Sequence, residues 1–95
     1  MSRRRFLVCY DICDPGRLRA VHSVMKAFGH AVQYSVFVCD LDQSERFALR
    51  YEIGQVINHT SDRILFADLG EATGPSRFTF MGRTSILPRQ GPTIV

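Results

Sequence analysis

The apolar positions of this chain fall into short strand-like runs separated by stretches with helical spacing. The first run, residues 5–11, is aromatic and branched until it ends on the carboxylate of Asp11, a composition typical of a buried strand. The other runs predicted as strands are residues 32–39, 63–69 and 77–81, with a last edge strand at 93–95.

A first helix is predicted directly after the first strand. Asp14 is suited to the N-cap position, and Pro15 to the first helical position, where a missing N–H costs nothing. Gly29 is placed to end this helix in a left-handed conformation. The apolar residues that share one helical face are Leu18, Val21, Val24, Met25 and Phe28.

A second helix is predicted over residues 43–57. Asp42 and Glu45 have the three-residue spacing of a capping box, with Asp in place of the usual Ser or Thr. The apolar residues of this helix spread around more than one face, so the pattern leaves its buried side undefined.

The order strand–helix–strand–helix–strand–strand predicts a single α+β domain over residues 1–95. A ferredoxin-like βαββαβ sandwich has one antiparallel sheet and needs two antiparallel strands between its helices. Residues 30–39 would then have to fold back near residues 33–35, where no Gly, Pro or Asn marks a turn.

Both faces of the predicted sheet are apolar. In the first strand, Phe6 and Val8 alternate with Leu7 and Cys9, whereas a sheet with helices on one face normally leaves its other face polar. Because two helices cover only one face, we expect the open sheet face to be buried in a twofold homodimer. The strand at 93–95, tethered by a Gly-Pro loop, is then placed to extend the partner's sheet.

The composition is that of an ordinary globular chain, with 45% hydrophobic and 22% charged residues. No apolar stretch approaches the roughly 18–20 residues of a membrane span. We therefore expect no membrane contact and a cytoplasmic protein. The three cysteines match no zinc pattern, and we interpret Cys9 and Cys39 as buried thiols.

The basic residues are strongly biased toward arginine. The net charge is only +3, but eleven arginines stand against one lysine, Lys26. The planar fork of arginine fits phosphate oxygens, so an anionic partner, nucleic acid first, is one interpretation. High-GC codon usage is the other.

Asp11 is the strongest candidate for chemistry. A carboxylate that ends an apolar strand needs a partner, and a hard cation such as Mg²⁺ binds one or two carboxylates plus water. In a twofold dimer, two copies of Asp11 could share one Mg²⁺ or Mn²⁺ ion and support phosphodiester hydrolysis. The alternative is that Asp11 only accepts backbone hydrogen bonds in the next turn. Asp68 ends its strand similarly and is a second-rank metal candidate.

Arg17, Arg19 and Lys26 form a basic helix face close to a helix N-terminus, where free N–H groups also attract phosphate. Such a face would bind the nucleic-acid backbone without reading bases. The alternative is a solvated face whose cations pair with nearby acids.

Several segments, in their order and spacing, resemble the small CRISPR adaptation proteins of the Cas-two family. They are Tyr10-Asp11-Ile12, Asp14-Pro15-Gly16-Arg17-Leu18-Arg19, Gly29, Val32-Gln33-Tyr34-Ser35-Val36-Phe37, and the closing Leu87-Pro88 with Pro92-Thr93-Ile94-Val95. The resemblance implies a ferredoxin-like homodimer with an added C-terminal strand. It also implies a Mg²⁺-dependent endonuclease centred on Asp11, acting on RNA or double-stranded DNA.

The same resemblance implies a scaffold role in spacer acquisition. Members of the family bridge the CRISPR integrase subunits, and the positions of Arg17 and Arg19 touch the DNA backbone. Val38 departs from the family, which often carries an acid at this point. A toxin-type ribonuclease of similar fold stays open as an alternative. An RRM-type RNA-binding domain is disfavoured, because residues 63–69 lack the base-stacking signature.

Overall fold

The structure, a computed structural model, describes residues 2–75, 77–83 and 93–94. Its order of elements confirms the α+β prediction. The elements are β1 (Arg4–Asp11), α1 (Pro15–Phe28), β2 (His30–Gln33), β3 (Val36–Leu41), α2 (Gln43–Val56), β4 (Arg63–Glu71), β5 (Thr79–Phe80) and β6 (Thr93–Ile94).

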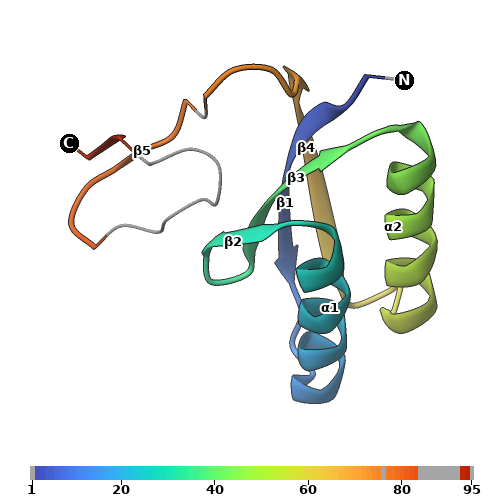
Figure 1. The fold of residues 1–95 in the computed structure, drawn as a ribbon. Helices are drawn as coiled ribbons and strands as arrows, with labels where there is room; N and C mark the ends of the chain where they lie inside the picture. Colours follow the sequence, from blue (N-terminus) through green and yellow to red (C-terminus); the bar gives the residue numbers. More distant parts are fainter. Residues whose placement is uncertain (1, 76, 84–92, 95) are drawn as a thin grey trace.

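Four strands form one antiparallel sheet in the order β2-β3-β1-β4, and both helices lie on the same side of it (Figure 1). This is the ferredoxin-like arrangement that the sequence predicted. β5 and β6 form a separate parallel pair. The predicted C-terminal strand therefore exists, and it pairs within its own chain; Val95 lies outside the described residues.

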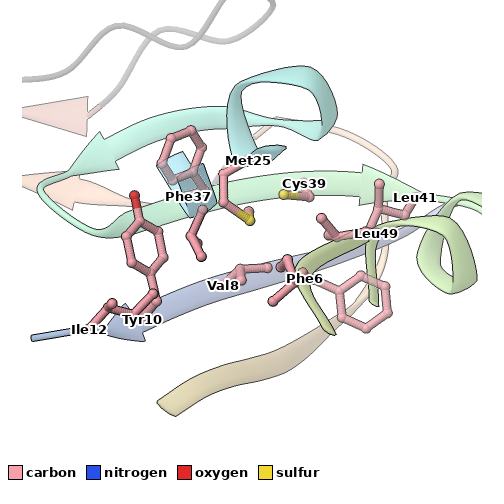
Figure 2. Close-up of a cluster of buried hydrophobic side chains, with 11 residues drawn as sticks. Phe6, Val8, Tyr10, Ile12, Met25, Phe37, Cys39, Leu41 and Leu49 are labelled. Atoms are coloured by element: carbon pink, nitrogen blue, oxygen red, sulfur yellow. The ribbon is translucent and has the colours of Figure 1, made fainter. Parts of the chain in front are cut away.

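The main core lies between the sheet and the helices (Figure 2). From β1, Phe6, Val8 and Tyr10 point into it, because alternate residues of a strand face the same side. The buried residues contributed by the other elements are Val21 and Met25 of α1, Phe37, Cys39 and Leu41 of β3, and Leu49 and Ile53 of α2. Within the described residues, neither helix is long and apolar enough to cross a membrane.

A second, smaller apolar cluster lies on the other face of the sheet. Val32 and Val38 are buried there, and Phe78 and Phe80 pack against them. The expectation that this whole face is left for a partner is thus wrong for the β2–β3 half, which the chain covers itself. The β1–β4 half is covered less: Leu7 of β1 is half-buried against this cluster, whereas the side chain of Leu65 on β4 is 58% exposed.

The predicted strand at 32–39 is two strands. They are joined by a tight turn at Tyr34 and Ser35, and Ser35 has a φ of 60°. The carbonyl of Ser35 accepts a hydrogen bond of 3.1 Å from the backbone N–H of Tyr10 in β1. This contact to the central strand helps to hold a conformation that non-glycine residues rarely adopt.

Both helix starts are as predicted. The Asp14 side chain accepts a 2.9 Å bond from the backbone N–H of Arg17, with Pro15 as the first helical residue. Asp42 and Glu45 form the complete capping box, with each side chain bonded to the other's backbone N–H. These contacts satisfy N–H groups that have no partner within the helix.

Gly29 ends α1, but the left-handed conformation predicted for it is wrong. Its φ of −164° and ψ of −162° are extended. The reason for glycine is space, because a Cβ here would overlap the carbonyl oxygen of Val38 and lie 2.5 Å from Cys39 Sγ. Cys39 itself is fully buried, as predicted, and burial raises the pKa of its thiol to about 12. Cys9 is only half-buried.

Replacing Gly29 should therefore destabilise the fold. Gly29→Ala should lower the free energy of unfolding by about 1–3 kcal/mol, because α1 and β3 must separate to admit a methyl group. Gly54→Ala is the matched control, since its added Cβ meets no atom within 4 Å. That variant should be unchanged, or more stable by up to about 1 kcal/mol. Urea denaturation measures both, and equal stability of the two variants would contradict the close-approach argument.

Candidate functional site

Asp11 lies at the end of β1 on the sheet face away from the helices, directly opposite Arg63 of β4. Its side chain is 71% exposed, so the carboxylate is better solvated than its place after an apolar strand suggested. The described residues provide one hydrogen bond to this carboxylate, 3.4 Å from Arg63 Nη2 to Asp11 Oδ2. The alternative role as an acceptor for the following turn therefore has no contact to support it among the described residues.

The two residues share a shallow hollow of about 310 Å³, lined also by Cys9, Tyr10 and Leu65. The hydroxyl of Tyr10 points to the opposite, helix-covered face, where it lies 3.0 Å from His22 Nδ1. Burial raises the pKa of Tyr10, so its phenol stays protonated at neutral pH. The charged side chains that line the hollow are Asp11 and Arg63.

Asp68 does not join this site. It pairs with Phe6 near the other end of β1, so this second-rank metal candidate lies away from Asp11. Its carboxylate accepts bonds of 3.0 and 3.2 Å from Arg4 Nε and one of 2.8 Å from the backbone N–H of Gly70. These bonds, that of Arg4 first, lower the pKa of Asp68.

A single chain offers little to a metal ion. Among the described residues, no three His, Cys, Asp or Glu side chains come together as a metal-binding group. Asp11 still fits one Mg²⁺ ligand, because Mg²⁺ keeps several waters and uses only one or two carboxylates. Its exposure leaves room for those waters. Each chain thus supplies one carboxylate.

Arg17 is bound within the fold. Its guanidinium donates bonds of 2.8 and 3.3 Å to Asp62, whose side chain is 0% exposed. Asp62 also accepts a 2.8 Å bond from the backbone N–H of Asn58. The Arg17 bond, and then the Asn58 bond, lower the pKa of Asp62. This pair ties the start of α1 to the turn before β4.

Arg19 differs from Arg17, because it is exposed and makes no ion pair within the described residues. Lys26 is exposed on the same helix. The arginines at positions 3–5 add little free charge to the surface of the protein, because each pairs with an acid. The pairs are Arg3–Glu45, Arg4–Asp68 and Arg5–Asp40.

Sequence reasoning missed Asp62 and Arg63. Asp62 follows a polar turn and is 45 residues from Arg17, so no local pattern links the two. Arg63 opens the predicted strand at 63–69. Antiparallel pairing of that strand with the first one would have placed it near Asp11.

The fold and site define a small ferredoxin-like α+β protein with one exposed carboxylate at the end of its central strand. The family profile described as CRISPR associated protein Cas2 matches residues 4–74. A protein named CRISPR-associated endoribonuclease Cas2 1 from Rhodospirillum rubrum is 43% identical over 71 residues, 75% of this chain and 70% of that protein. CRISPR-associated endoribonuclease Cas2 from Geobacter sulfurreducens is 37% identical over 67 residues, 70% of each chain. The chain belongs to the Cas2 family, as the sequence resemblance indicated.

Solved structures agree with this assignment. Cas2 from Streptococcus pyogenes has a TM-score of 0.65 and 34% identity, covering 70% of this chain and 86% of that chain. A hypothetical protein from Thermus thermophilus has a TM-score of 0.74 and 26% identity, covering 90% of this chain and 98% of that chain. Family membership favours a CRISPR function over the toxin-type ribonuclease.

The two arginines of the basic helix face should differ in their effect on stability. Arg17→Ala should lower the free energy of unfolding, because it leaves the buried Asp62 carboxylate without its cation. Arg19→Ala should stay within about 0.5 kcal/mol of the parent, as for other exposed positions. Urea denaturation at neutral pH separates the two. Equal free energies of unfolding for the two variants would show that the Arg17–Asp62 pair does not contribute to stability.

The stability difference between the parent and Arg17→Ala should also depend on pH. The folded state holds the pKa of Asp62 below its ordinary value of 3.8. The contribution of the pair is therefore fully present above that value and is lost as the pH falls through the lower folded-state pKa. Denaturation curves at neutral pH and below pH 3.8 should show the gap between the two proteins narrowing in acid.

Proposed function

We propose that this chain is a CRISPR spacer-acquisition subunit that binds double-stranded DNA as a homodimeric scaffold for the CRISPR integrase. We also propose that Asp11 from two chains forms a Mg²⁺- or Mn²⁺-dependent endonuclease centre acting on RNA or DNA. The observation that carries the proposal is the exposed Asp11 on the part of the sheet face that the chain leaves uncovered. Membership of the Cas2 family supports the CRISPR context.

The homodimer would use the open β1–β4 half of the sheet. Leu65 is 58% exposed beside the half-buried Cys9, its cross-strand neighbour on β1. Apolar side chains of this kind on a sheet face favour burial against another surface. A second copy of the chain, related by a twofold axis, would cover Leu65 and would also supply the second Asp11 carboxylate of the proposed metal centre.

The two Asp11 carboxylates would be the protein ligands of the metal ion. When bound, such an ion lowers the pKa of a coordinated water and stabilises charge on a phosphate. The contribution of the chain is to hold each carboxylate at the end of a rigid central strand. The relatives are named endoribonucleases, which supports RNA as one substrate class.

DNA binding would rest on the exposed cations of α1. The guanidinium of Arg19 makes no ion pair with any described residue, while that of Arg17 is bound to Asp62. Backbone contacts of this type bind without reading sequence and weaken strongly with salt. A cytoplasmic location is part of the proposal, since free cysteines such as those here are typical of reducing compartments.

The dimer can be tested at Leu65. Leu65→Glu should shift the protein from dimer to monomer, because a charge cannot be buried there without a partner. Tyr51→Glu is the matched control on α2, where a large side chain is 68% exposed. It should remain a dimer in sedimentation velocity. A parent protein that is monomeric at micromolar concentration would refute the proposed association.

The metal centre can be tested at Asp11. Asp11→Asn keeps the size of the side chain but removes the charge that binds the cation. Cleavage of RNA or DNA in Mn²⁺ should be abolished, because the ion loses its charged protein ligand, while dimer formation and duplex binding persist. Cleavage at the parent rate would place the activity elsewhere or in a contaminant.

Arg19→Ala should instead affect the binding of duplex DNA. It should weaken duplex DNA binding and flatten the salt dependence by about one phosphate contact, while leaving the dimer intact. Equal salt slopes for this variant and the parent in fluorescence anisotropy would remove Arg19 from the DNA-binding surface.

A further inference from the structure

We propose that Arg63 is a phosphate-binding residue of the Asp11 centre, and that it occupies the carboxylate until a metal ion takes its place. This inference rests on the proposed metal-dependent function of Asp11. It adds a second residue of this chain to that site and predicts how the two respond to metal and to nucleic acid.

The register of the sheet puts these residues together. Asp11 and Arg63 are direct cross-strand partners at the ends of β1 and β4, and both face the same hollow. Their side chains are 71% and 85% exposed. The arginine is therefore free to move on its four-bond stem while its backbone stays fixed in the sheet.

The bond between them is weak compared with the other ion pairs of the described chain. Arg63 Nη2 lies 3.4 Å from Asp11 Oδ2, whereas the shortest distances in the Arg5–Asp40 and Arg17–Asp62 pairs are 2.8 Å. Those two pairs are also more buried. Exposed pairs such as Asp11–Arg63 contribute little to stability, so this contact gives no structural reason for an arginine here.

Binding of a metal ion to Asp11 would affect Arg63 in two ways. Arg63 competes with a metal ion for Asp11, because the two positive charges repel each other at this range. When the ion is bound, the guanidinium is released from the carboxylate and stays beside the centre. The planar guanidinium, with its five N–H donors, can then bind two oxygens of one phosphate group.

The exposed rim of the hollow is the part that suits a phosphodiester linkage. In the proposed dimer the partner copy covers Leu65 and Cys9, and the charged side chains left at the rim are Asp11 and Arg63. The substrate class is therefore the phosphate backbone of a nucleic acid, recognised without base contacts.

The experiment measures metal binding and RNA binding separately in the full chain. Mn²⁺ binding, followed by electron paramagnetic resonance without nucleic acid, should tighten about three- to tenfold in Arg63→Ala, because a competing cation is gone. Binding of a fluorescein-labelled RNA should be stronger in Mn²⁺ than in EDTA for the parent, and this gain should be lost in Arg63→Ala. If Arg63 had only a structural role, Arg63→Ala would weaken both the binding of Mn²⁺ and the binding of RNA.

Three variants make the result decisive. Arg50→Ala removes an exposed arginine on α2, away from the hollow. It should change neither the Mn²⁺ affinity nor the gain in RNA binding that Mn²⁺ produces. Arg63→Lys keeps the charge, so its Mn²⁺ affinity should stay near that of the parent while the gain in RNA binding falls. Asp11→Asn should abolish Mn²⁺ binding at this centre.

The outcomes separate the two proposals. If Asp11→Asn binds Mn²⁺ like the parent, the metal centre itself is wrong and the role of Arg63 falls with it. If Asp11→Asn loses Mn²⁺ but Arg63→Ala binds it no more tightly, or keeps the full RNA gain, only the inference about Arg63 is overturned.

Discussion

The register of β1 decides where the other features of this molecule lie. As one of the two inner strands it pairs with β3 on one side and β4 on the other, so the alternation of its side chains is fixed from both sides. Val8 and Tyr10 point toward the helices, and this commits Asp11 to the opposite face beside Leu65. A slip of one residue would bury the acid under the helices and expose the core. Packing of the core therefore also positions the carboxylate.

Local chemistry explains how much of the fold could be predicted. The caps at Asp14 and Asp42 act within three residues, and both predictions are confirmed. The turn between β2 and β3 carried no such signal, because Ser35 takes a positive φ that Gly or Asn usually supplies. Gly29 was predicted as a glycine with a special conformation, yet its role is close contact with Val38. That neighbour is known only once α1 packs on β3.

The candidate site shows the same division between local and distant information. Asp11 was identifiable because a carboxylate at the end of an apolar run is a local pattern, although its exposure was not foreseen. Arg17 and Arg19 looked alike in sequence. The structure distinguishes them, because only Arg17 meets Asp62. Likewise, the position of Arg63 opposite Asp11 follows from strand register, which depends on how distant segments pair. The sequence identifies the positively charged residues, but it does not show which acid each of them contacts in the fold.

The way the chain covers its own sheet bears on how two copies would associate. Phe78 and Phe80 occupy the β2–β3 half, over Val32 and Val38. A dimer built on that half would have to displace both phenylalanines, and it would leave each Asp11 away from the contact. The β1–β4 half needs no displacement and contains the acid at its rim. Self-coverage of the β2–β3 half by Phe78 and Phe80 therefore favours the other half, with Asp11 at its rim, as the surface of the proposed dimer.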